Sequence, residues 1–166
     1  MTKKNIMFFP LLACLIFYMS LFAGCGNMEV KADISAYADT PITICGLKEE
    51  NFNITPAQLA QMDCIKQKAV GQSDKAGTVY AVGPTLETFL AFYGKTINDF
   101  SKVKFSASDG YIKSFTTEEL SEFDYILAIA DGDKPLDNTE IPLRIIIPGG
   151  DSFNWVRMIN KIEFIS

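Results

Sequence analysis

Two side chains of this 166-residue sequence stand where their chemistry could be used, a thiol and a guanidinium. Cys64 follows a segment that begins like a helix and precedes a run typical of a strand, a junction at which side chains often point into a cleft. Three roles are open for it: an inert buried thiol, a disulfide with Cys45, or a thiolate that acts in catalysis or ligates a metal. Arg144 lies at the start of an apolar run just after Pro142. A buried arginine there requires an anionic partner, either a protein carboxylate or a bound anion.

Three loops carry sequences that could hold a ligand. Asp109-Gly110-Tyr111 fits a hairpin turn with an outward tyrosine, or a part of a binding site. Gly149 and Gly150 offer bare N–H groups for a phosphate or carboxylate, although a plain turn also explains the pair. In the third loop, over residues 131–137, the spaced carboxylates are those of a calcium loop, but a proline and a leucine occupy the ligand and turn positions. We therefore predict a solvated turn there.

Composition narrows the chemistry further. The sequence contains no histidine, which excludes Ser-His-Asp triads, Cys-His dyads and histidine-ligated zinc. The formal charge is −5, and it is −7 from Cys25 onward because Lys3 and Lys4 are the only charged residues before position 25. That balance argues against nucleic acid as a partner. With 48% hydrophobic residues, the chain has the composition of a single globular domain.

The N-terminus has the pattern of a bacterial lipoprotein signal. An almost wholly apolar run over residues 6–23 follows the two lysines and ends in Ala23-Gly24-Cys25. This ending resembles a lipobox, in which the cysteine receives a diacylglyceryl group and becomes the first residue. Cys14 is a competing acceptor, but its apolar segment is short. An uncleaved signal anchor is the alternative to cleavage.

This pattern sets the expected organisation of the chain. We expect a signal peptide over 1–24, a flexible tether over 25–40 and one domain over 41–166. The signal is of the Sec type, so the protein would be extracytoplasmic and held to the cell membrane by the lipid on Cys25.

Short elements must position the candidate residues. Capping sequences predict helices that begin after Thr55, Thr85 and Thr116, and Gly94 is expected to end the second one. Seven strand-like runs lie between and around them, over residues 42–45, 65–70, 78–82, 103–107, 125–130, 143–147 and 155–165. This mixture predicts an α+β fold with mixed sheets of short strands. The run 145–147 is apolar on both faces and is expected to be a central strand.

Taken in order, these segments resemble the sulfite-oxidase-type molybdopterin-binding domain from residue 44 to about residue 162. The matching segments are ITICGL, VGPTLETFLAFYG, VKFSASDGYIKSF, YILAIADGDKPLD, PLRIIIPGG and WVRMINKIEF. The resemblance implies the fold of that family, a molybdenum ligand at Cys64 and a pterin-holding arginine at Arg144. By the same resemblance, Asp109, Gly110, Tyr111, Gly149, Gly150 and Trp155 are candidates for the cofactor cleft.

The sequence departs from the family at two expected donors. Thr139 stands where many members have a histidine, and Asn154 stands where many have a lysine. Both lost groups would donate to an anionic pterin phosphate. The signal begins Lys3-Lys4-Asn5 without an arginine, unlike the twin-arginine signals that export members already loaded with the cofactor.

These departures favour a binding module without the cofactor, which uses the cleft for a small anionic ligand or for a redox or membrane partner protein. The alternatives are a molybdopterin-dependent oxidoreductase with Cys64 on the metal, and a scaffold protein with inert or bridged thiols.

Overall fold

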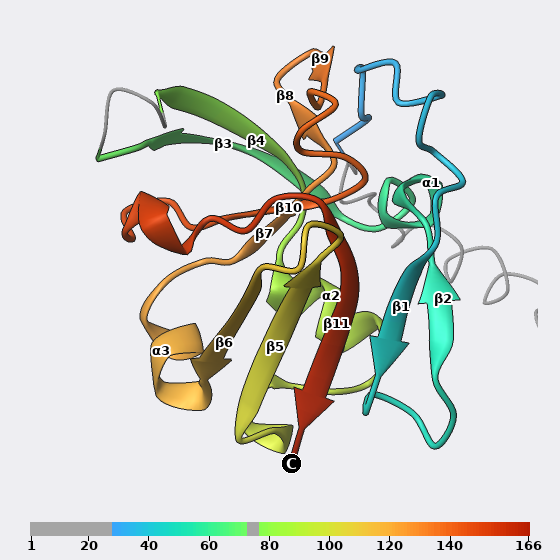
Figure 1. The fold of residues 1–166 in the computed structure, drawn as a ribbon, viewed down its shortest axis with the longest axis vertical. Helices are drawn as coiled ribbons and strands as arrows, with labels where there is room; N and C mark the ends of the chain where they lie inside the picture. The colour runs from blue at the N-terminus through green and yellow to red at the C-terminus, as the bar shows by residue number, and fades with distance from the viewer. Residues whose placement is uncertain (1–27, 73–76) are drawn as a thin grey trace, which may run out of the picture.

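The computed structural model describes residues 28–72 and 77–166, which form three β-sheets and three short α-helices (Figure 1). The signal peptide, Cys14 and Cys25 lie outside the described residues. The largest sheet has the order β2 (Phe52–Ile54), β1 (Ile42–Cys45), β11 (Ile159–Ile165), β5 (Lys102–Ala107), β6 (Ile112–Thr116). Strands β1 and β11 are parallel and the other neighbours are antiparallel. The predicted α+β class with mixed sheets is confirmed.

Two smaller sheets complete the β-structure. One has the order β3 (Cys64–Val70), β4 (Thr78–Pro84), β8 (Ala130–Asp131), β9 (Lys134–Pro135). The other pairs β10 (Arg144–Ile146) with β7 (Ile126–Ala128). Strand β10 is fully buried but, among the strands of the described residues, pairs only with β7, so the expectation of a central strand is wrong. An apolar run indicates that both faces of a strand are buried, but it does not indicate how many strands pair with it.

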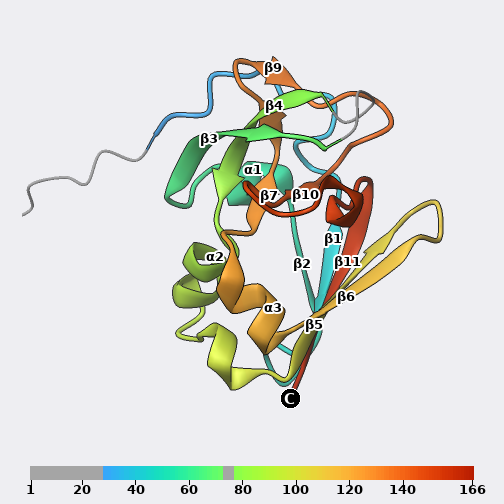
Figure 2. The same cartoon turned by 90° about the vertical axis from the view of Figure 1, so that its left-hand side faces the viewer.

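The three predicted helices form where their capping residues place them. Thr55, Thr85 and Thr116 cap α1 (Pro56–Leu59), α2 (Leu86–Phe92) and α3 (Thr117–Glu122) through their side-chain oxygens. Helices α2 and α3 lie on one side of the large sheet (Figure 2). None of the described helices is long and apolar enough to cross a membrane.

The core lies between this sheet and the helices. Phe89 of α2 is fully buried, and its ring stacks on that of Phe164 of β11 with centroids 6.2 Å apart. Strands β1 and β5 alternate buried and less buried residues, as expected for strands with one face on the core.

The C-terminal strand is shorter than predicted. It begins at Ile159 instead of residue 155, because Met158 has a positive φ of 56°, which interrupts extended backbone; a 3-10 helix, η2 (Ser152–Asn154), precedes Trp155. A second 3-10 helix, η1 (Ile97–Asp99), follows α2. Strands β2, β6 and β9 were not predicted, since each is short and half exposed and has little hydrophobic pattern.

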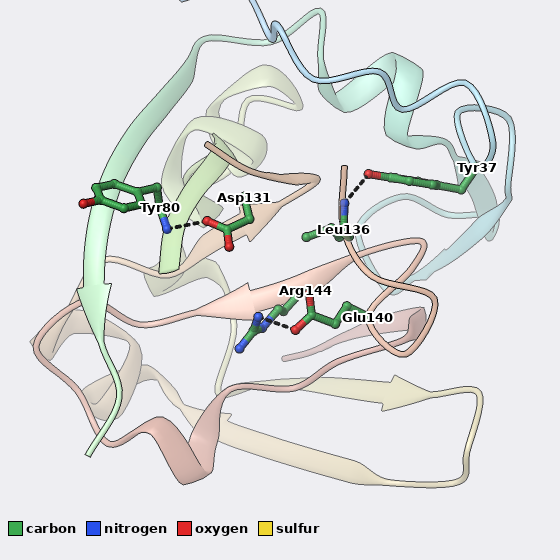
Figure 3. Close-up of polar contacts among 6 residues, drawn as sticks. All are labelled: Tyr37, Tyr80, Asp131, Leu136, Glu140 and Arg144. Atoms are coloured by element: carbon green, nitrogen blue, oxygen red, sulfur yellow. Dashed lines mark hydrogen bonds and ion pairs between the residues drawn. The ribbon is translucent and has the colours of Figure 1, made fainter. Parts of the chain in front are cut away.

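Residues 28–40, which we call the N-terminal strap, are packed on the domain instead of forming a flexible tether. Tyr37 is 3% exposed, and its hydroxyl donates to the Ile129 carbonyl at 2.8 Å and accepts from the Leu136 N–H at 2.9 Å (Figure 3). Ala32 packs on Val82 and Ala130 of the β3-β4-β8-β9 sheet. The tether prediction is wrong for these residues because isolated apolar side chains can anchor a segment that has no periodic pattern.

Candidate functional site

An open cleft of about 780 Å³ lies among the β5–β6 turn, the start of β4, β8, the segment before β10, and η2. Four of the predicted site residues line it, namely Asp109, Tyr111, Arg144 and Trp155. A cleft of this size is in the range used for small-molecule binding. The fold therefore brings together residues that are as much as 46 positions apart in the sequence.

Arg144 is the buried charge of the cleft. It is 7% exposed, and its Nη1 donates to Glu140 Oε1 at 2.5 Å. Its Nε has no hydrogen-bond partner among the described residues, and the far end of the guanidinium points away from Glu140 (Figure 3). Burial lowers the pKa of Arg144, while Glu140 opposes this shift. The protein carboxylate thus satisfies only part of the donor fork, which leaves capacity for an anionic group of a ligand.

Aromatic side chains surround this arginine. The guanidinium carbon of Arg144 lies 5.5 Å from the centroid of the Trp155 ring, and the indole N–H donates to the Ile147 carbonyl at 3.3 Å. Phe153 is 75% exposed and Tyr111 is 47% exposed, and both line the cleft. Exposed aromatic rings beside a fixed charge suit a ligand with an apolar or ring-shaped part.

The rest of the lining is acidic. Four carboxylates, from Asp109, Asp131, Asp137 and Glu140, face two guanidinium groups, from Arg144 and Arg157. Asp131 is fixed in place because its Oδ1 accepts from the N–H of Tyr80 at 2.7 Å (Figure 3). Excess negative charge of this kind disfavours a ligand that carries several phosphates.

Cys64 lies far from the cleft. It pairs with Pro84 at one end of the β3–β4 hairpin, whereas the cleft is lined at the other end by Thr78 and Val79. Five or six residues of strand separate these ends, which is roughly 16 to 20 Å at 3.3 Å per residue. The expectation that Cys64 belongs to the cleft is therefore wrong. The junction before the strand turns the side chain inward, where its thiol donates to the Leu59 carbonyl at 3.6 Å.

The environment of Cys64 is that of an inert thiol. The residue is 5% exposed, and burial raises its pKa to about 11, with a further contribution from the charge of Asp63. Cys45 is half-buried in β1, and both thiols are free in the structure, so the disulfide alternative is not found.

The predicted turns have different positions relative to the cleft. The Asp109-Gly110-Tyr111 turn is a hairpin turn, in which the Tyr111 N–H donates to Asp109 Oδ1 at 2.9 Å, and it also lines the cleft. Gly149 and Gly150 do not line it, and the Gly150 N–H is already bound to the Ile147 carbonyl at 3.1 Å. The pair forms a turn outside this cleft, which agrees with the plain-turn alternative, and its role in binding stays a prediction.

The segment 131–137 forms the short β8–β9 hairpin. No cluster of three or more metal-ligating side chains is found in residues 28–72 and 77–166. Two of its carboxylates, Asp131 and Asp137, nevertheless line the cleft. The sequence analysis did not predict Asp131, Asp137, Glu140, Phe153 or Arg157 as cleft residues. It interpreted residues 131–137 as a solvated turn and considered each loop separately. The spaced acidic residues from Asp131 to Glu140, which precede Arg144, could have indicated an acidic lining.

Comparison with known proteins identifies the family. Residues 33–166 match the family model of the oxidoreductase molybdopterin binding domain, so the chain belongs to that family. Among solved structures, the sulfane dehydrogenase SoxCD from Paracoccus pantotrophus is similar with a TM-score of 0.63 and 18% identity. The match covers 77% of this chain but only 38% of the SoxCD chain, and at this identity it shows the fold alone. A search of curated proteins found no significant match.

The residues of the cleft do not fit the cofactor that the family name implies. Of the cysteines that the structure describes, Cys45 and Cys64, neither lines the cleft, so no thiolate is placed there to ligate molybdenum. The four carboxylates oppose an anionic pterin phosphate by charge repulsion. Asn154 and Thr139, the two departures from the family pattern, also lie outside the lining.

Proposed function

We propose that this domain is a lipid-anchored, extracytoplasmic binding module that keeps the family fold but works without the molybdenum cofactor. The observation that carries the proposal is the composition of the cleft, which has four carboxylates and no cysteine among its described lining residues. Molybdenum would need a soft thiolate ligand, and the pterin phosphate would need several hydrogen-bond donors or positive charges.

The proposed ligand is a small molecule with a single anionic group and an apolar or aromatic part. Its anionic group would accept from the free end of the Arg144 guanidinium, and Arg157 lies at the same cleft. The exposed rings of Tyr111 and Phe153 would contact the apolar part. The surrounding carboxylates would select against polyanions by charge repulsion. A partner protein that presents such a group, for example a carboxylate side chain beside an aromatic one, would meet the same cleft.

The anchor is proposed from the sequence. Cys25, which follows Ala23-Gly24, would carry the diacylglyceryl group, and the Lys3-Lys4 signal without arginine fits export by the Sec route. This route threads an unfolded chain, and it is consistent with a domain that requires no cofactor loaded before export.

Membership of the family favours one second candidate, a molybdopterin-dependent oxidoreductase. That function would require a metal ligand other than Cys64, whose buried thiol donates to the Leu59 carbonyl and does not line the cleft. It would also require the cofactor to tolerate the acidic lining.

Thermal melting with candidate ligands tests the binding function. A monoanionic aromatic acid, such as benzoate or indole acetate, should raise the melting temperature of the wild-type protein by mass action. A polyanion such as pyrophosphate should not. Arg144→Lys keeps the charge but loses the planar fork, and it should abolish most of the shift. Stabilisation by pyrophosphate equal to that by the aromatic acid would contradict the proposed ligand class.

A further inference from the structure

The end of the described chain nearest the proposed lipid lies on one particular face of the small sheet. In the N-terminal strap, Met28, Val30 and Ile34 pack on the cluster of Ala32, Val82 and Ala130. The register pairs Val82 with Lys66 and with Ala130, so all three residues share one face of the sheet. Val82 is 2% exposed because the strap covers it.

Part of the rest of that face is exposed, whereas Cys64 and Pro84 at its other end are buried. Lys68 pairs with Tyr80, and both share the face of Lys66, as does Val70 two residues further along β3. We call Lys66, Lys68, Val70 and Tyr80 the strap face. Val70 is 60% exposed and Tyr80 is 45% exposed. Lys66 pairs with Asp133 at 3.1 Å, and Lys68 has no ion-pair partner among the residues the structure describes.

The opposite face of the same sheet looks into the cleft. Val79 and Asp131, which line the cleft, belong to the alternate set of residues in β4 and β8, while Thr78, which pairs with Val70 at the end of the hairpin, also lines the cleft. Figure 2 shows the blue start of the described chain at one side of the molecule and the β5–β6 turn, which carries Asp109 and Tyr111, at the other. The sheet therefore lies between the cleft and the strap face, and the two meet only at the end of the hairpin, at Thr78.

The length of chain before the strap restricts how far the domain can stand from a membrane. Only Gly26 and Asn27 separate Cys25 from Met28, and three residue steps span at most about 11 Å even when fully extended. An acylated Cys25 would sit at the lipid surface, so the face that carries Met28 would be held against the bilayer. A tyrosine, a valine and two lysines are side chains that suit this zone, because lysine stems lie along apolar surface while their ammonium groups reach the lipid phosphates.

We propose that the strap face rests on the lipid bilayer and that the cleft opens away from it, toward ligands or partners in the aqueous space. This inference depends on the proposed lipidation of Cys25. It assigns the occupant of the strap face as phospholipid headgroups and upper acyl chains, and it makes the cleft accessible to molecules that are not in the membrane.

Tryptophan fluorescence in vesicles of phosphatidylglycerol and brominated phosphatidylcholine tests the orientation. The chain has one tryptophan, Trp155, in the cleft, so the wild-type protein supplies the baseline. Full-length lipidated Tyr80→Trp places a second indole on the strap face, and Phe153→Trp places one at the exposed rim of the cleft. The added emission of Tyr80→Trp should fall by roughly half in brominated lipid, because an interfacial indole lies near the acyl chains. That of Phe153→Trp and of Trp155 itself should stay unchanged.

Two controls separate the inference from the anchor on which it rests. Mass spectrometry shows whether Cys25 is acylated. An unacylated protein that leaves the vesicles would overturn both the proposed lipidation and the proposed orientation. If the protein is acylated and bound, quenching of Phe153→Trp, or no quenching of Tyr80→Trp, would overturn the orientation alone. Val70→Trp on the same face repeats the test if Tyr80→Trp does not fold, and it should be quenched in the same way.

Discussion

At the scale of single residues, Arg144 holds a buried positive charge between one carboxylate and one aromatic ring. Glu140 lies 2.5 Å from it, with side-chain exposures of 8% for the arginine and 13% for the glutamate. Removing either partner leaves the other charge buried without compensation. The two charges therefore stabilise the fold only as a pair, and the Nε of Arg144 keeps no hydrogen-bond partner among the described residues.

A double-mutant cycle tests this pairing. Arg144→Met should lower the free energy of unfolding by about 3 to 5 kcal/mol, since it leaves the Glu140 carboxylate unpaired. Glu140→Gln should cost a similar amount, and the double variant should recover much of the loss. Urea denaturation of the four proteins gives the coupling energy. Additive single effects would show that the two groups do not act together.

Cys64 illustrates a thiol that burial makes unreactive. Its folded pKa of about 11 exceeds the ordinary value of 9.0, so roughly 100-fold less thiolate is present at a given pH below 9. Iodoacetamide at pH 8 should therefore modify Cys45 in the folded protein while leaving Cys64 untouched until urea is added. Mass mapping of the peptides reads the outcome. Equal rates at the two cysteines would contradict this burial.

The same shift predicts a loss of stability in alkali. Because the folded pKa is raised, the thiol's contribution is complete below about pH 9 and disappears as the pH rises through about 11. The wild-type protein should lose about 2 to 3 kcal/mol across this window relative to Cys64→Ala. Unfolding titrations at pH 8 and pH 11 measure the difference. A pH dependence that Cys64→Ala leaves unchanged would assign the loss to other groups.

At the scale of elements, the crossing of β4 over β7 depends on Gly83. A Cβ there would lie 2.0 Å from the carbonyl oxygen of Leu127, a backbone atom that cannot move independently of its strand. Gly83→Ala should force the strands apart and destabilise the protein by several kcal/mol or prevent folding, as overpacking against backbone does. Gly94→Ala is the matched control, because a Cβ there meets nothing within 4 Å and costs only about 1 to 2 kcal/mol for its left-handed backbone. Thermal unfolding compares the two, and similar melting temperatures would contradict the close crossing.

The N-terminal strap depends on one hydroxyl that two backbone groups share. Tyr37→Phe keeps the ring but leaves the Ile129 carbonyl and the Leu136 N–H without this partner. We expect a loss of about 1 to 3 kcal/mol and faster hydrogen exchange across residues 28–40. Tyr111→Phe, at an exposed position, is the control and should change stability little. Unchanged exchange in Tyr37→Phe would show that apolar packing alone holds the strap.

The sequence predicts local elements well, but it predicts poorly which elements contact one another in space. The Thr55, Thr85 and Thr116 caps place all three helices, because capping is a contact among residues a few positions apart. The partners of β10, the packing of the strap and the distance of Cys64 from the cleft each depend on contacts between distant segments. In the candidate site, Arg144 was found because a lone charge in an apolar run needs a partner, whereas Asp131 and Asp137 resemble ordinary turn residues until the fold brings them to the cleft.

At the scale of the whole molecule, the family fold carries a cleft with an acidic lining. The chain belongs to the oxidoreductase molybdopterin binding domain family, and its cleft is assembled from the edges of the β-sheets and the loops between them. The main core cluster consists of apolar side chains, and of the charged cleft residues only Arg144 is buried. A change of lining could therefore alter what the cleft holds without altering the fold.

The most direct test of the proposed function is the molybdenum and pterin content of the wild-type protein extracted from its native membrane. The amount of each is measured per mole of protein, by elemental analysis for the metal and by fluorescence of the oxidised pterin. The account predicts far less than one equivalent of both, with Arg144→Lys and Cys64→Ser indistinguishable from the wild type. One equivalent of molybdenum and pterin in the wild type, lost in Arg144→Lys, would contradict it and would establish a loaded oxidoreductase site.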